Sequence, residues 1–163
     1  MRRTIVLFAS LFIAASAFAA GTGGGGGGGG TGGGMGGGAR MAPTSALDWY
    51  NAGYSASDQH NYQEAVTDFK NAISLRSDYA EAYNMLGFCT RKLGNVNEAF
   101  AYYEKALKLK PNFPEAREYY GEAYLQEGDL AKAVQQYIIL EKAGNKNARE
   151  LLEKIDVYVN QKS

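Results

Sequence analysis

The sequence predicts an all-α fold, a solenoid of three antiparallel helix pairs closed by a C-terminal capping helix. Three observations predict it. Gly53, Gly87 and Gly121 recur at intervals of 34 residues. Small and aromatic residues recur at the same interval, and the apolar residues inside each interval follow the spacing of a helix face. A fixed period of this length is typical of stacked helical repeats.

The N-terminal region does not share this pattern. Residues 1–19 combine Arg2 and Arg3, an apolar run and small residues around Ala19, which is the layout of a cleaved secretory signal peptide. An uncleaved membrane anchor is the alternative. We expect residues 20–41 to be a disordered linker, because a segment so rich in glycine buries almost no apolar surface. A spacer is its expected role, and glycine-driven assembly is the alternative.

Composition excludes several classes of protein. Removing Arg2 and Arg3 from 17 basic residues leaves 15 against 17 acidic ones, so the mature net charge is −2. That charge does not attract nucleic acid, and we expect no membrane insertion after cleavage. Cys89 is the single cysteine, so it has no disulfide partner. His60 is the single histidine, so it has no second histidine and no cysteine pair with which to bind a metal. The glycine run follows no strand, so it is no phosphate loop, and no hydrolase motif occurs. We therefore expect no catalytic residue, metal or cofactor.

Each of the three units predicts two helices separated by a short turn. Ser45 followed by Asp48 forms a capping box at the first helix start. The units span 46–79, 80–113 and 114–147, and their expected helices are 45–58, 62–76, 80–93, 96–109, 114–127 and 130–143.

The glycines raise a physical question, because a glycine inside a helix costs about 1 kcal/mol relative to alanine. In each unit a small residue follows the glycine by twelve positions, and an aromatic residue comes four positions later. These residues are Ala65, Ala99 and Ala133, then Phe69, Tyr103 and Tyr137. We expect the missing side chain of Gly87 to let the second helix approach at Ala99 and to seat the ring of Tyr103. Close packing then offsets the cost of the glycine.

This pattern resembles the tetratricopeptide repeat over nearly all of the folded region. The third unit departs from it at Arg117, Leu140, Glu141 and Asn145, as end units often do. The resemblance implies a right-handed superhelix whose first helices line a concave groove. It also implies that this groove binds a segment of a partner protein.

The last segment, about 146–161, is expected to cap the exposed flank of the third unit. A helix that binds another protein is the alternative. Apolar residues share one stripe of this helix: Ala148, Leu151, Leu152, Ile155 and Val159. Elsewhere, Cys89 is expected to be buried and His60 to lie in an exposed turn.

Helical spacing identifies the residues expected to face the groove: Tyr50, Tyr54, Asn84, Phe88, Arg91, Lys92, Glu118 and Glu122. The aromatic residues suggest anchors for a partner. Beside them lie two basic residues, Arg91 and Lys92 (the positive step), and two acidic residues, Glu118 and Glu122 (the negative step). Alternatively, the tyrosines pack on the neighbouring unit and the charges merely solvate a helix face.

One class within the family is disfavoured. Members that bind chaperone tails hold a terminal carboxylate with lysine, asparagine and arginine. Asn84 matches this pattern, but Tyr50 stands where a lysine is needed, and Glu118 and Glu122 replace basic residues. A partner segment with apolar or aromatic anchors and some positive charge fits better.

The sequence therefore predicts an exported, non-catalytic protein-interaction scaffold, periplasmic if the source is bacterial. The alternative is a structural or self-associating subunit of a cell-envelope assembly, and the oligomeric state stays open. An enzyme with an unrecognised site is a third hypothesis, for which the sequence offers no cluster of titratable groups.

Overall fold

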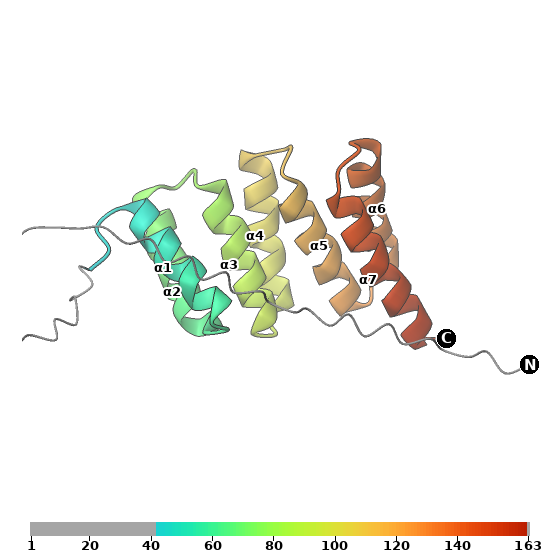
Figure 1. Ribbon diagram of the computed structural model, residues 1–163, viewed down its shortest axis with the longest axis horizontal. Coiled ribbons are helices and arrows are strands. Elements are labelled where there is room, and N and C mark those ends of the chain that lie inside the picture. The colour runs from blue at the N-terminus through green and yellow to red at the C-terminus, as the bar shows by residue number, and fades with distance from the viewer. Residues whose placement is uncertain (1–41, 163) are drawn as a thin grey trace, which may run out of the picture. The chain divides into compact units, whose positions relative to one another are not determined.

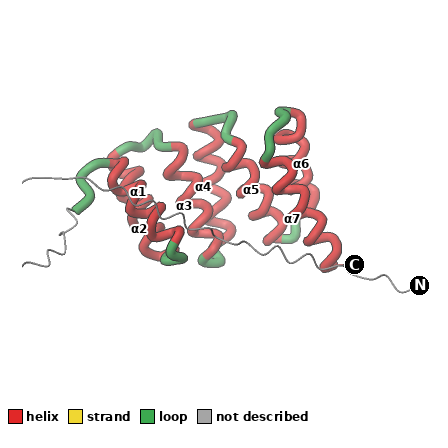
Figure 2. Tube along the Cα trace, viewed as in Figure 1, coloured by secondary structure: helices red, strands yellow, loops and turns green. Residues whose placement is uncertain are grey.

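The computed structural model describes residues 42–162, so the predicted signal peptide and linker lie outside the described residues. Over this range Figure 1 shows helices joined by short turns, and Figure 2 shows no strand. The all-α prediction is confirmed, and each helix begins and ends within one residue of its expected position. The helices are α1 (Ala46–Asp58), α2 (Tyr62–Leu75), α3 (Ala80–Lys92), α4 (Val96–Leu109), α5 (Pro114–Glu127), α6 (Leu130–Lys142) and α7 (Asn147–Lys162).

The helices form two layers in a row of antiparallel pairs (Figure 1). The first helices touch one another in order, from α1 to α3, α5 and α7. Within residues 42–162, the backbones of the second helices α2, α4 and α6 do not approach one another closely, and an exposed ion pair between Lys70 and Glu98 links α2 to α4. The first-helix layer is therefore the tighter one, and it forms the inner, concave side of the stack. Over the same residues, no helix is long and apolar enough to cross a membrane.

The helix ends follow local sequence rules. The predicted capping box is confirmed: the Asp48 amide donates to Ser45 Oγ at 3.1 Å, and the Ser45 amide donates to Asp48 Oδ2 at 2.9 Å. The turns after α3 and α5 use Gly94 and Gly128 with φ of 90° and 86°. Glycine suits this left-handed conformation because it has no Cβ.

The close approach predicted at the repeat glycines is confirmed in the first two units. A Cβ on Gly87 would lie 2.8 Å from Cε1 of Tyr103, and a Cβ on Gly53 would lie 3.0 Å from Cε1 of Phe69. Both rings are completely buried. The glycine therefore makes room for an aromatic ring of the second helix.

The third unit is built differently. The nearest side chain to Gly121 is Leu151 of α7, which a Cβ would meet at 2.6 Å. Tyr137, at the aromatic position, is half-buried, and its hydroxyl donates to Glu141 at 2.6 Å. The reason is that α7 packs against both α5 and α6, so a leucine of the capping helix reaches the glycine.

The capping helix α7 buries a narrower stripe than predicted. Ala148, Leu151 and Ile155 are buried, as expected. Leu152 and Val159 are 36% and 41% exposed, so their placement on the buried stripe was wrong. They fall at the edge of the face that α7 turns toward α5 and α6. The cap therefore leaves apolar surface at the open end of the stack.

Cys89 is buried, as predicted, and its thiol donates to Ser57 Oγ at 3.6 Å. Burial raises the pKa of this thiol to about 11. A thiol with so high a pKa forms little of the reactive thiolate near neutral pH. Cys89 is therefore a packing residue.

Candidate protein-binding groove

Two adjoining hollows lie on the first-helix layer. We call the smaller, of about 220 Å³, the aromatic hollow; it is lined by Tyr54, Ser57, Asp58, His60, Tyr62, Met85, Phe88 and Tyr119. The larger, of about 520 Å³, is the charged cleft; it is lined by Phe88, Lys92, Glu115, Glu118, Tyr119, Glu122, Lys146, Asn147, Glu150 and Lys154. Because Phe88 and Tyr119 line both, the hollows form one groove from α1 to α7.

Two of the three predicted aromatic groove residues line the aromatic hollow. Tyr54 is 46% exposed and Phe88 is half-buried. The ring of Phe88 lies 5.1 Å from that of Tyr119 and 6.2 Å from that of Tyr62, between ring centroids. Neither of these two tyrosines was among the predicted groove residues. The hollow is thus walled by rings from four helices.

Tyr50 lies elsewhere. Its ring stacks on Tyr79 at 5.0 Å and contacts Phe69 at 5.6 Å. Burial, aided by nearby Tyr79, raises the pKa of its hydroxyl to about 12. For Tyr50 the structure favours packing inside the stack, against Phe69 of its own unit and Tyr79 at the N-cap of α3, over a role in the groove.

Three of the predicted polar groove residues are buried, which differs from the prediction. Asn84, Arg91 and Glu118 are 4%, 6% and 3% exposed. The guanidinium of Arg91 forms an ion pair with Glu122 at 2.7 Å and donates to the Tyr103 hydroxyl at 3.4 Å. The predicted positive and negative steps are therefore largely bound to each other. Of these charges, Lys92 stays exposed to solvent.

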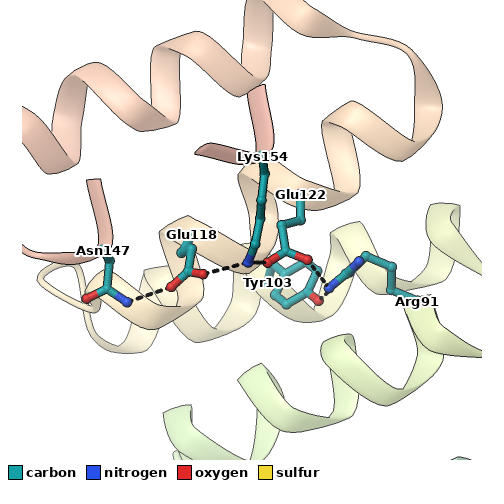
Figure 3. Close-up of polar contacts among 6 residues, drawn as sticks. All are labelled: Arg91, Tyr103, Glu118, Glu122, Asn147 and Lys154. Carbon is teal, nitrogen blue, oxygen red and sulfur yellow. Dashed lines mark hydrogen bonds and ion pairs between the residues drawn. The ribbon is translucent and has the colours of Figure 1, made fainter. Parts of the chain in front are cut away.

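The capping helix completes this polar network (Figure 3). Lys154 reaches between the two carboxylates of α5, donating to Glu118 Oε1 at 2.9 Å and to Glu122 Oε1. Asn147 Nδ2 donates to Glu118 Oε2 at 2.6 Å. Burial alone would lower the pKa of Lys154, but the hydrogen bonds to Glu122 and Glu118 outweigh it, so that pKa is raised. The network joins α3, α5 and α7 and closes the floor of the charged cleft.

Sequence reasoning missed Asn147 and Lys154. One signal was present: they lie seven residues apart, and Glu118 and Glu122 lie four apart, so each pair shares one face of its helix. Two polar residues beside the apolar stripe of a capping helix indicate a buried polar partner on the helix it covers.

The sequence is similar to a protein family and to a repeat-containing relative. The family model for regulators of microtubule dynamics proteins 1-3 matches residues 49–127. The tetratricopeptide repeat-containing protein trd-1 of Caenorhabditis elegans is 29% identical over 97 residues, which are 60% of this chain and 13% of trd-1. The chain thus spans a small part of that relative.

Solved structures show the same arrangement of helices. The crystal structure of MamA is 32% identical, with a TM-score of 0.55 over 68% of this chain and 60% of MamA. The first TPR domain of Spaghetti (RPAP3), bound to the HSP90 peptide SRMEEVD, is 20% identical, with a TM-score of 0.63. That match covers 71% of this chain and 94% of the Spaghetti domain.

Proposed function

We propose that this chain, whose sequence and fold resemble those of tetratricopeptide-repeat proteins, is a non-catalytic interaction module that binds a segment of a partner protein in its concave groove. The single observation that carries this proposal is the continuity of the aromatic hollow with the charged cleft. A related fold holds a peptide in the Spaghetti complex. An extended segment lying along this groove would meet aromatic anchors first and charges second.

The energetics support anchoring at the aromatic hollow. Large aromatic side chains in a partly enclosed hollow contribute much of the binding energy of protein interfaces. Tyr54 and Phe88 are available for this role, because neither is completely buried. In the charged cleft, Glu118 and Glu122 already have partners from α3 and α7. We therefore place affinity in the hollow and orientation of the segment in the cleft.

The double variant Tyr54→Ala, Phe88→Ala is expected to bind the partner more than about tenfold more weakly, because aromatic anchors contribute about 2 kcal/mol or more when truncated. The partner is first identified by photo-crosslinking in the native cells from a benzophenone side chain at position 54. Its dissociation constant is then measured by calorimetry with the purified partner.

The control is Ile139→Ala, which removes an apolar side chain that is 42% exposed on α6, outside both hollows. Circular dichroism must show equal helix content in both variants. Unchanged affinity of the double variant, or equal losses in the two variants, would contradict the groove proposal.

The alternative proposal, self-association, has one specific observation in its favour. Apolar side chains stay exposed at the C-terminal end of the stack: Ile138, Ile139, Leu152, Val157 and Val159. Exposed apolar surface of this kind can mark a protein interface. Light scattering of the mature chain is expected to give a monomer if the groove alone binds. A defined dimer or larger oligomer would favour the structural role.

We also propose that the module works outside the cytoplasm, in the periplasm of a bacterial source. The support for this is the composition of residues 1–19, with basic, apolar and small-residue parts in the order of a signal peptide. Fractionation of cells that produce the full chain, with the N-terminus of the mature protein sequenced, checks this location.

A further inference from the structure

We infer that the aromatic hollow binds a cationic side chain, arginine or lysine, of the partner segment. This inference rests on the proposed function and names the chemistry that its anchor recognises. The hollow has a volume of about 220 Å³ and opens on the concave side, where α1, α2, α3 and α5 each contribute a ring.

The rings form walls at different angles. Tyr62 meets Phe88 edge-on, at an interplanar angle of 75°, and Tyr119 is tilted by 42° relative to Phe88. Tyr54 contributes the exposed rim. The face of each ring carries partial negative charge, which attracts a cation within about 6 Å of the ring centroid. A hollow with such walls suits a guanidinium or ammonium group.

Elsewhere in this chain, lysine and arginine residues lie over aromatic rings. Arg76 lies 3.2 Å from the ring centroid of Tyr79, and Lys110 lies 4.4 Å from that of Phe113. In the described part of the chain, no such cation lies over the rings of Tyr54, Tyr62 or Tyr119. No lysine or arginine of this part of the chain therefore occupies these three rings, although the His60 ring stacks against one face of Tyr62.

Phe88 is the shared wall and has cations near it. Lys92 Nζ lies 5.3 Å from its ring centroid, and the Arg91 guanidinium lies 5.7 Å away. Lys92 lines the charged cleft and does not line the hollow. Arg91 is neutralised by its ion pair with Glu122. The cation of a partner would therefore rest mainly on Tyr54, Tyr62 and Tyr119.

The charge of the residues that line the hollow is negative, opposite to that of the proposed cation. Asp58 is exposed and contributes the carboxylate of the hollow, and neither lysine nor arginine lines it. His60 stands at the rim in the left-handed conformation, with φ of 64°, where the later turns have Gly94 and Gly128. Its ring lies nearly parallel to Tyr62, at 5.8 Å and 11°. A residue other than glycine in this conformation stores strain, which often marks a functional position.

His60 provides a direct readout, because it is the single histidine of the chain. The probes are four capped pentapeptides, Gly-Gly-X-Gly-Gly, where X is arginine, lysine, citrulline or norleucine. Citrulline keeps the planar end of arginine and removes its charge. Norleucine keeps the four-carbon stem of lysine and removes its ammonium group. The chain is titrated with each peptide, and the imidazole signals of His60 are followed by NMR above the usual pKa of histidine.

The arginine and lysine peptides are expected to shift the His60 signals saturably. Their dissociation constants should be at least about fivefold lower than those of their neutral counterparts. Asp58→Asn and Tyr62→Leu should each weaken that binding, with Asp78→Asn, an exposed aspartate outside the hollow, as the matched control. Equal binding of arginine and citrulline, or no saturable shift with either cationic peptide, overturns the inference. If the peptides give one of these two results while Tyr54→Ala, Phe88→Ala still weakens partner binding more than about tenfold, docking in the groove stands and cation recognition falls.

Discussion

The Gly87→Leu variant is expected to lose about 3 kcal/mol of unfolding free energy, at the upper end of what overpacking costs in a well-packed core. The first atom of the new side chain would already lie 2.8 Å from Cε1 of Tyr103, and that ring is completely buried. Neither α3 nor α4 can move away without also disturbing the pairs on either side. Urea denaturation followed by far-ultraviolet circular dichroism measures the loss.

A double-mutant cycle with Tyr103→Ala separates overpacking from other effects. Truncating this ring alone should cost about 3–5 kcal/mol, because it leaves a cavity in the core. In the double variant, the leucine enters the space that the ring has left, so its cost should be well below the sum of the two single costs. Strict additivity would show that the leucine does not clash with Tyr103.

The Arg91→Met variant is expected to lose about 3 kcal/mol of unfolding free energy, because it removes one of the two counter-ions of the largely buried Glu122 carboxylate. The side chains of Arg91 and Glu122 are 7% and 14% exposed, and the two lie 2.7 Å apart. Lys154 still contacts Glu122 in this variant, which keeps the loss at the lower end of the range for buried pairs. Urea denaturation again measures it.

The matched control is Arg149→Met on α7. Arg149 pairs with Glu153 at 3.1 Å, but these side chains are 87% and 66% exposed. Exposed pairs of this kind contribute less than about 1 kcal/mol, so this variant should be nearly as stable as the parent chain. Similar losses for Arg91→Met and Arg149→Met would mean that the buried network does not stabilise the fold.

The regular part of the fold could be predicted because each repeat carries its own packing rule. The recurrence of Gly87 and Tyr103 at fixed spacing identified the close contact between paired helices, and the structure shows that contact. Helix ends were equally predictable, since Ser45, Asp48 and the turn glycines act locally. Both kinds of signal depend on residues close together in the chain or related by the repeat.

The polar part of the groove could not be predicted in the same way. Spacing shows which face of a helix a residue occupies, and it placed Glu118 and Arg91 on the concave face. Whether that face stays open depends on how α7 docks, which is a tertiary property. Lys154 lies 36 residues after Glu118 in sequence, outside the repeat pattern. The departure of Gly121 from the common scheme has the same origin, since Leu151 also belongs to α7.

The polar contacts that hold α7 against α5, from Asn147 and Lys154 to Glu118 and Glu122, restrict how this protein can gain further repeats. A further helix pair inserted between α6 and α7 would set a new first helix against α5. Glu118 would then be enclosed without either of its present partners. Only a new helix with an amide and a cation at the positions equivalent to Asn147 and Lys154 would avoid this. Enclosing an uncompensated carboxylate is costly, so simple duplication of a unit at this position would destabilise the stack.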